Sequence, residues 1–263
     1  MMKQLRAEFY KLTHSHMLIV LPLLFVLAFF ILTKTSNGVY ILYCNYGEES
    51  IGFFAFLKAM GASTFIAEDI AHTVISTSWT LWIFILIFSL SFFYKDFQEG
   101  TINLALGNGT SLTTIFLTKC ITIISYFTIC YIIYCIVSSL YTNTIMKATL
   151  NMSDILLIIQ ILILCYIILI SFIFTCLFLA SLFNSIFISA ILLCAGNFIS
   201  SYLIITTWAP GIKPPLYYLW MPMYYLMSLS HRTIPHEILI YSAVNIIILP
   251  VLTLFLLKRR YLK

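Results

Sequence analysis

The side chains that could take part in chemistry are few in this sequence, and their spacing fits no common catalytic motif. Glu48 and Glu49 are adjacent carboxylates, but Ser-Ile-Gly-Phe follows them without a basic partner. There is no GxxxxGK[ST] phosphate loop, no HExxH zinc motif and no nucleophile elbow. The seven cysteines lack the spacing of a zinc site or a disulfide framework. A membrane-embedded hydrolase is therefore unsupported, and we expect this chain to bind no cofactor or metal.

Three polar side chains fall deep within apolar runs: Gln160, Asn197 and Asn245. No Asp, Glu, Lys or Arg lies at such a depth, whereas ion-coupled carriers usually place ionisable groups near the membrane midplane. The three polar side chains could contact a cargo, although hydrogen bonds across helices are the commoner role. A transport cycle without an internal proton or ion relay needs energy delivered from outside the membrane.

The polar stretch 94–120 is the segment best shaped to receive that energy, because it joins two long apolar runs. We expect a short helix from Phe97 to Leu106, stopped by the Gly-Asn-Gly sequence that follows, since Gly and Asn accept left-handed backbone geometry. A second helix would start at Thr110 or Ser111, whose hydroxyl groups can cap it, and run through Lys119 into the next span. The sequence predicts a helix, a hinge and a helix that protrude from a membrane, with a solvated loop as the alternative.

Composition indicates the class of protein that holds this stretch. The 263 residues are 62% hydrophobic and 9% charged, with a mean hydropathy of +1.05. Such a chain has too little polar surface to enclose a water-soluble core, so we predict an all-α integral membrane protein. The net charge of +5 comes from basic residues beside apolar runs, where contact with anionic membrane lipids explains them better than nucleic-acid binding.

Six transmembrane helices are predicted, at about residues 17–33, 73–94, 121–140, 155–183, 186–207 and 237–257. The apolar run 155–207 is too long for one crossing, and Asn184 followed by Ser185 marks its break. Residues 1–16 would form an amphipathic helix in the headgroup layer, with its apolar face made by Met2, Leu5, Phe9, Leu12 and His16. Residues 208–236 hold five prolines among aromatic residues, which suits a re-entrant or interfacial element before the last span.

The distribution of basic residues predicts that both termini are cytoplasmic. This orientation places nine of the fourteen Lys and Arg inside: Lys3, Arg6, Lys11, Lys95, Lys119, Lys258, Arg259, Arg260 and Lys263. Two termini on one side require an even number of spans, which six satisfies. Residues 95–120 then form a cytoplasmic loop, and residues 141–154 a short exterior turn.

With these features the chain resembles, over its whole length, the type-2 ABC exporter permeases. The likeness rests on RAEFYKL in the amphipathic start, the six-span plan, YKDFQEGTINLALGNGTSLTTIFLTK after the second span, the SLFNS turn and the long aromatic loop before the last span. Size and layout are most similar to the small bacterial permeases that expel lantibiotics, bacitracin or related membrane-active peptides, often as self-immunity. The closest motif is Asp96-Phe97-x-x-Gly100-Thr101-Ile102, followed by small polar residues and Lys119.

In those permeases this loop carries the coupling helix, which sits in a cleft of the ATPase subunit. The resemblance implies that this contact is made by Phe97, Glu99, Thr101, Ile102 and Leu106. A basic residue often found after the hinge is absent, since Thr110, Ser111 and Leu112 stand there, so the register of the contact stays open. The resemblance also implies that ATP and Mg are bound by separate ATPase chains, and that the permease pairs with a second copy or a sister permease.

The sequence thus predicts the permease subunit of an ATP-driven exporter in the bacterial cell membrane, with an amphipathic peptide or another hydrophobic molecule as cargo. Candidate cargo contacts at an exterior gate are Tyr217, Trp220, Tyr224 and Tyr225. One alternative is a passive immunity protein that sequesters a peptide without ATP. A lipid-modifying membrane enzyme is a third possibility, disfavoured by the missing motifs. The cargo, the direction of transport and the identity of the ATPase stay open.

Overall fold

The computed structural model describes residues 2–15, 17–35, 74, 78, 81–146, 151–207 and 236–261. Within these residues the regular structure is entirely α-helical, which confirms the predicted all-α class for the described part of the chain. The helices are α1 (Met2–Thr13), α2 (Met17–Thr35), α5 (Leu81–Gln98), α6 (Thr101–Gly107), α7 (Leu112–Met146), α8 (Met152–Phe183), α9 (Ile186–Thr207) and α11 (His236–Tyr261).

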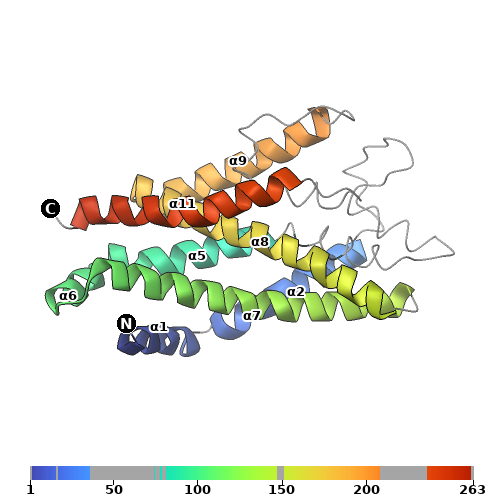
Figure 1. The fold of residues 1–263 in the computed structure, drawn as a ribbon, viewed down its shortest axis with the longest axis horizontal. Coiled ribbons are helices and arrows are strands. Elements are labelled where there is room, and N and C mark those ends of the chain that lie inside the picture. Colours follow the sequence, from blue (N-terminus) through green and yellow to red (C-terminus); the bar gives the residue numbers. More distant parts are fainter. Residues whose placement is uncertain are drawn as a thin grey trace.

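The longer helices run roughly along the long axis of the molecule, and the short helices α1 and α6 lie near one end of it (Figure 1). The end of α11 and the turn between α8 and α9 lie at that same end. We call it the charged end, because it carries Lys11, Lys119 and the basic last turn of α11. Helix α7 begins there and reaches the opposite end, where α8 begins (Figure 1).

Three of the described helices are long and apolar enough to cross a membrane: Leu112–Thr144, Met152–Phe183 and Ile240–Tyr261. A fourth crossing is obtained if α5 and α6, which are bent by 54° at the break between them, are taken together. Helices α2 and α9 coincide with two further predicted spans, but their described apolar parts are shorter. The membrane character of the chain is thus supported, and the number of six spans stays a prediction.

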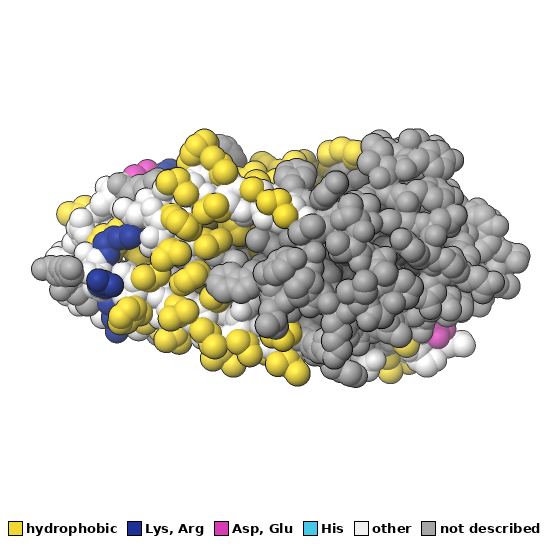
Figure 2. Space-filling view, turned by 90° about the horizontal axis from the view of Figure 1, so that it is seen from above, with side chains coloured by type: hydrophobic (Ala, Val, Ile, Leu, Met, Phe, Trp, Pro, Cys, Tyr) yellow, Lys and Arg dark blue, Asp and Glu magenta, His cyan; other side chains and the backbone are white. Residues whose placement is uncertain are grey.

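The surface of the described helices suits contact with hydrocarbon. Exposed aliphatic and aromatic residues line the outer faces, as on α7 (Ile129, Ile132, Ile136), α9 (Phe187, Ile188, Ile191) and α11 (Ile247, Val251, Phe255). Figure 2 shows hydrophobic side chains covering the described middle of one face, with Lys and Arg gathered toward one end. This arrangement is the one expected of helices whose sides face lipid and whose basic end faces the headgroups.

The predicted break in the apolar run 155–207 is present at Asn184. Its backbone is left-handed, with φ 53°, and its N–H donates to the Ala180 carbonyl at 3.0 Å, which ends α8. The hydroxyl of Ser185 then accepts the Ile188 N–H at 3.3 Å and caps α9. Local chemistry therefore fixes this turn, as the sequence indicated.

The helix before the hinge begins later than predicted. Instead of starting at Phe97, α6 starts at Thr101, because α5 continues through Gln98 and the chain breaks at Gly100, whose φ is +71°. The Thr101 hydroxyl donates to the Asp96 carbonyl at 3.1 Å, which satisfies one of the free carbonyl groups at the end of α5. The end of α6 at Gly107 agrees with the prediction.

Helix α7 is longer than the predicted third span. Its start is confirmed, because the Ser111 hydroxyl accepts the Thr114 N–H at 3.2 Å, and it continues through Lys119 without interruption. At its other end it extends to Met146, so the predicted exterior turn 141–154 is wrong in its first residues. The run of 35 residues is about 52 Å of helix, which is longer than the ~30 Å hydrocarbon thickness of a membrane.

Candidate functional site: a charge cluster behind a projecting helix

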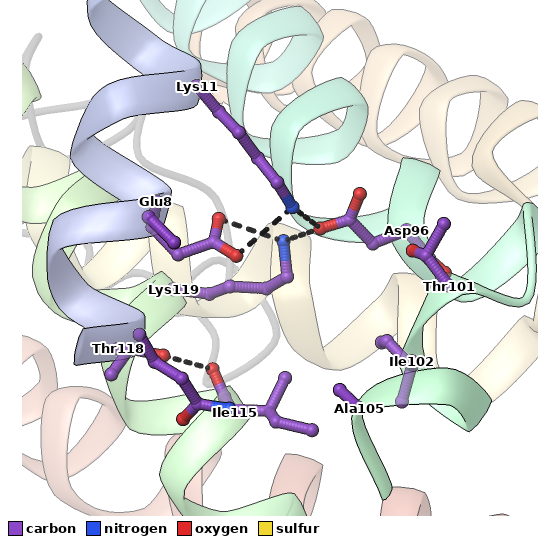
Figure 3. A pocket seen from close by; sticks show the side chains of 11 residues that line it. Glu8, Lys11, Asp96, Thr101, Ile102, Ala105, Ile115, Thr118 and Lys119 are labelled. Carbon is purple, nitrogen blue, oxygen red and sulfur yellow. Dashed lines mark hydrogen bonds and ion pairs between the residues drawn. The ribbon is translucent and has the colours of Figure 1, made fainter. Parts of the chain in front are cut away.

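Four charged side chains meet where α1 packs beside α7 (Figure 3). The Lys119 ammonium lies 2.5 Å from Asp96 Oδ2 and 3.3 Å from Glu8 Oε2. The Lys11 ammonium lies 3.0 Å from Asp96 Oδ2 and 3.3 Å from Glu8 Oε1. We call these four residues the charge cluster. It joins α1 to the C-terminal end of α5 and to α7, although Lys11 and Asp96 are 85 positions apart in the sequence.

Lys119 is the most deeply buried member, with a side chain only 1% exposed. Burying an ammonium group costs several kcal/mol unless carboxylates and hydrogen bonds compensate it. Here two carboxylates do so, the Phe92 carbonyl accepts a further hydrogen bond at 3.5 Å, and the Phe92 ring lies 5.2 Å away. With two cations and two anions the cluster is neutral, so its members compensate one another.

The inward face of α1 differs from the predicted apolar face. Glu8 and Leu12 are its buried residues, whereas Met2, which was assigned to the apolar face, is 70% exposed. Glu8 and Leu12 are one turn apart, so a helix that packs Leu12 against the spans also turns Glu8 inward. The carboxylate is acceptable there because it meets Lys119 and Lys11. Helix α1 is therefore tied to the spans by charge as well as by apolar contact.

The outer cation of the cluster, Lys11, lies on α1, outside the predicted spans. Partial burial alone would lower the pKa of its ammonium, but the hydrogen bond to Asp96 and the charges of Glu8 and Asp96 outweigh it and raise the pKa above its usual value. Lys11 is thus fully charged at neutral pH, and α1 is held to the end of α5 under those conditions.

A cavity of about 190 Å³ separates the charge cluster from α6. Its walls include Thr101, Ile102 and Ala105 of α6, and Ile115 and Thr118 of α7 (Figure 3). Gln4 Oε1, on α1, is buried at its edge without a hydrogen-bond partner. The site offers no nucleophile beside a base, and its charges are mutually neutralised. What this arrangement can do is hold three helices together behind α6.

The five predicted coupling residues differ in how deeply the structure buries them. Phe97 and Ile102 are buried, at 6% and 3% exposure, and the Phe97 ring lies 5.1 Å from Phe93 and 5.5 Å from Tyr261. These two side chains therefore hold α5, α6 and α11 together instead of facing a partner. Glu99 and Thr101 are exposed, with Glu99 3.7 Å from Lys95, and Leu106 is half-buried.

Leu104 is the exposed apolar residue of α6 that the sequence reasoning missed. Its side chain is 72% exposed, two residues after the buried Ile102. On a seven-residue helix whose inner face is set by Ile102, position 104 turns about 200° away from the core. The periodicity could have indicated Leu104 once the start of α6 was known.

A second set of contacts ties the other side of the charged end. The Tyr94 hydroxyl donates to the side-chain oxygen of Asn184, and an Arg260 N–H donates to the same oxygen at 2.8 Å. These bonds join α5, the turn between α8 and α9, and α11. The predicted SLFNS turn is therefore a structural junction as well as a helix break.

The other predicted site residues are not brought together. Gln160 is exposed on α8 and Asn245 is half-buried on α11, and the structure shows no hydrogen bond between these two described residues. The side chain of Asn197 lies outside the described set. The predicted gate residues Tyr217, Trp220, Tyr224 and Tyr225 also lie outside the described residues.

No protein-family model, curated protein or solved structure matches this chain. A functional assignment therefore depends on the geometry and the sequence alone.

Proposed function

We propose that the protein is the membrane-spanning permease subunit of an ATP-driven exporter, with α6 as the helix that docks on a separate ATPase subunit. The observation that carries the proposal is the shape of the charged end. Helix α6 turns away from α5 by 54°, presents Leu104 outward, and is held from behind by Ile102. A short helix with a buried inner face and an exposed apolar tip suits a docking element.

The connections of α6 to the longer helices support a coupling role. It joins α5 through Gly100 and α7 through the short turn 108–111. Behind it, the charge cluster links α5 to α7 and α1. A force applied to α6 would thus reach three helices at once, two of them within the membrane, which is what transfer of motion from an ATPase requires.

The remaining parts of the proposal follow from the resemblance and the charge distribution. ATP and Mg are held by the ATPase chains, and the permease pairs with a second copy or a sister permease. The chain crosses the bacterial cell membrane six times with both termini in the cytoplasm. The cargo is an amphipathic peptide, such as an antimicrobial peptide, or another hydrophobic molecule.

Leu104→Ala tests the docking role more sharply than changes at Phe97 or Ile102. Both of those side chains are buried in the chain, so their removal would disturb folding as well as docking. The exposed Leu104 contributes little to the fold, whereas an apolar anchor in a partner's cleft is typically worth about 2 kcal/mol. We expect about thirtyfold weaker co-purification with the ATPase encoded in the same host, and a parallel loss of peptide resistance.

Asn103→Ala is the matched control, because Asn103 is exposed on the same helix and carries no apolar anchor. Both variants should reach the membrane at the wild-type level. If Leu104→Ala co-purified with the ATPase as well as the wild type does, α6 would not be the docking element.

A passive immunity protein is the second candidate, and one feature of the structure is compatible with it. A largely apolar groove of about 590 Å³ lies between α7 and α8 and could hold an amphipathic molecule without any ATPase. The two functions differ in one result: a passive binder protects cells when no ATPase is expressed, and an exporter does not.

A further inference from the structure

The groove between α7 and α8 has apolar walls along most of its length. Its α7 wall is Thr128, Tyr131, Ile132, Cys135, Ile136, Ser139, Leu140 and Asn143, and its α8 wall is Ile155, Ile158, Ile159, Leu162, Ile163 and Tyr166. From Thr128 to Asn143 the groove follows α7 for about 22 Å. Ile132, Ile136 and Ile163 are each at least half exposed, so the groove is open to the side of the molecule.

Polar groups in the groove are paired at one end and unpaired at the other. At the first end, the Thr128 hydroxyl lies 2.5 Å from the Tyr166 hydroxyl, and the Tyr131 hydroxyl donates to the Leu162 carbonyl at 2.9 Å. At the other end, Ser139 Oγ and Asn143 Oδ1 are buried without a hydrogen-bond partner. An unpaired buried polar atom is destabilising, so this end of the groove suits a ligand that supplies hydrogen bonds.

The unpaired end lies at the level of the headgroups on the side away from the charge cluster. Asn143 follows Lys119 by 24 residues on the continuous helix α7, a rise of about 36 Å. If Lys119 marks one membrane boundary, a hydrocarbon layer of ~30 Å places Ser139 and Asn143 at the other boundary. The apolar part of the groove then runs inward from that boundary to about the midplane.

We propose that this groove binds one membrane lipid of the leaflet farthest from the charge cluster. The acyl chain lies along the isoleucines of α7 and α8, and the headgroup or glycerol region forms hydrogen bonds with Ser139 and Asn143. This site goes beyond the proposed exporter function and requires no ATPase.

The distribution of polar atoms favours a lipid over a peptide. A peptide carries an N–H and a carbonyl at every residue, and in hydrocarbon each of these needs a partner along the whole length of the groove. The groove offers unpaired partners only at one end. An acyl chain needs none along its length, and a lipid headgroup needs them where Ser139 and Asn143 lie.

Photolabelling of the full-length protein tests the site. The protein would be placed in nanodiscs of phosphatidylcholine containing a small fraction of phosphatidylethanolamine with a diazirine in the middle of one acyl chain. After illumination, mass spectrometry should find adducts concentrated on the groove walls of α7 and α8. Ile136→Trp, which fills the groove, should lower this labelling at least fivefold.

The matched control is Ile129→Trp. Ile129 and Ile136 lie on α7 with nearly equal exposure, 55% and 54%, but only Ile136 lines the groove. The control should retain labelling within twofold of the wild type. If Ile136→Trp folds poorly, Ile159→Trp fills the same groove from the α8 wall. Removal of both polar partners in Ser139→Ala with Asn143→Leu should lower labelling about tenfold, the loss expected for about 1.4 kcal/mol.

Three results would overturn the proposal. The first is equal labelling of the filled-groove variants and Ile129→Trp. The second is a shift from dimer to monomer in Ile136→Trp with unchanged labelling, which would assign the groove to a second copy of the chain. The third is competition by an amphipathic peptide but not by excess unlabelled phosphatidylethanolamine, which would assign it to peptide cargo.

Discussion

The two ends of helix α7 differ in how the buried polar side chains that face its neighbours are paired. At the charged end, Lys119 is completely buried and meets two carboxylates from other helices. At the far end, the side-chain oxygens of Ser139 and Asn143 are buried and meet no partner. The charge cluster is thus closed by contacts within the chain, whereas Ser139 and Asn143 leave hydrogen-bonding oxygens for the proposed lipid.

Substitutions at the two ends of α7 should differ most in their effect on the free energy of unfolding. Lys119→Met leaves Glu8 and Asp96 with Lys11 as their one described counter-charge, and loss of one partner from a buried ion pair typically costs about 3–5 kcal/mol. Asn143→Leu removes a polar group that has no partner, so we expect a change of at most about 1 kcal/mol, of either sign. Unfolding in detergent, followed by circular dichroism, measures both.

Lys95→Met is the matched control for Lys119→Met, because Lys95 is 69% exposed and its pair with Glu99 is a surface one. The control should behave as the wild type. Adding Asp96→Asn to Lys119→Met should recover part of the loss, since the most closely paired carboxylate is then neutral. If Lys119→Met and Asn143→Leu lowered the free energy of unfolding by similarly small amounts, the two ends of α7 would not differ in this way.

A smaller effect is expected from the bend that sets α6 at the charged end. Gly100 has φ +71°, where a side chain costs about 1–2 kcal/mol, so Gly100→Ala should destabilise the protein by about that amount. Gly107→Ala is the control, because an added Cβ there meets no atom within 4 Å and the backbone is not left-handed. Equal stability of the two variants would show that the bend at Gly100 is not required.

The smallest effect concerns pH at the outer part of the charge cluster. The folded protein raises the pKa of Lys11, so its contribution is fully present below the unfolded value of about 10.5 and is lost as pH rises through the folded value. The stability difference between the wild type and Lys11→Met should therefore be constant from pH 7 to 10 and shrink above it. Because Lys11 is half exposed, the difference should be small and should decrease with salt. A difference that grew with alkaline pH would contradict this origin.

Features set by a few neighbouring residues were predictable from the sequence. The break at Asn184, the cap at Ser111 and the end of α6 at Gly107 each follow from backbone preferences that act within one turn. The start of α6 was predicted wrongly because either Phe97 or Gly100 could mark the boundary between α5 and α6. Which of them does so depends on how Phe97 packs. Its partner Tyr261 lies at the other end of the chain.

The charge cluster could not be located in this way, because its two closest pairs join residues 23 and 85 positions apart. The sequence shows Asp96 and Lys119 at the edges of apolar runs, which indicates a similar membrane depth but no contact. The inward turn of Glu8 depends on the docking of α1 against α7. The exposure of Leu104 likewise depends on which face of α6 packs against the other helices. The sequence does not show that face, and the docking residues inferred from the resemblance therefore included Phe97 and Ile102, which are buried.

The proposed function requires that α7 crosses the membrane, with α6 and the charge cluster on the cytoplasmic side and the end near Asn143 outside. Labelling with a membrane-impermeant maleimide tests it on Asn108→Cys and Thr144→Cys, two exposed positions beyond either end of the predicted span, each in a Cys44→Ser background. In intact cells we expect Thr144→Cys to be labelled and Asn108→Cys to be protected, and both to react after permeabilisation. Labelling of Asn108→Cys in intact cells would contradict both the orientation and the docking role of α6.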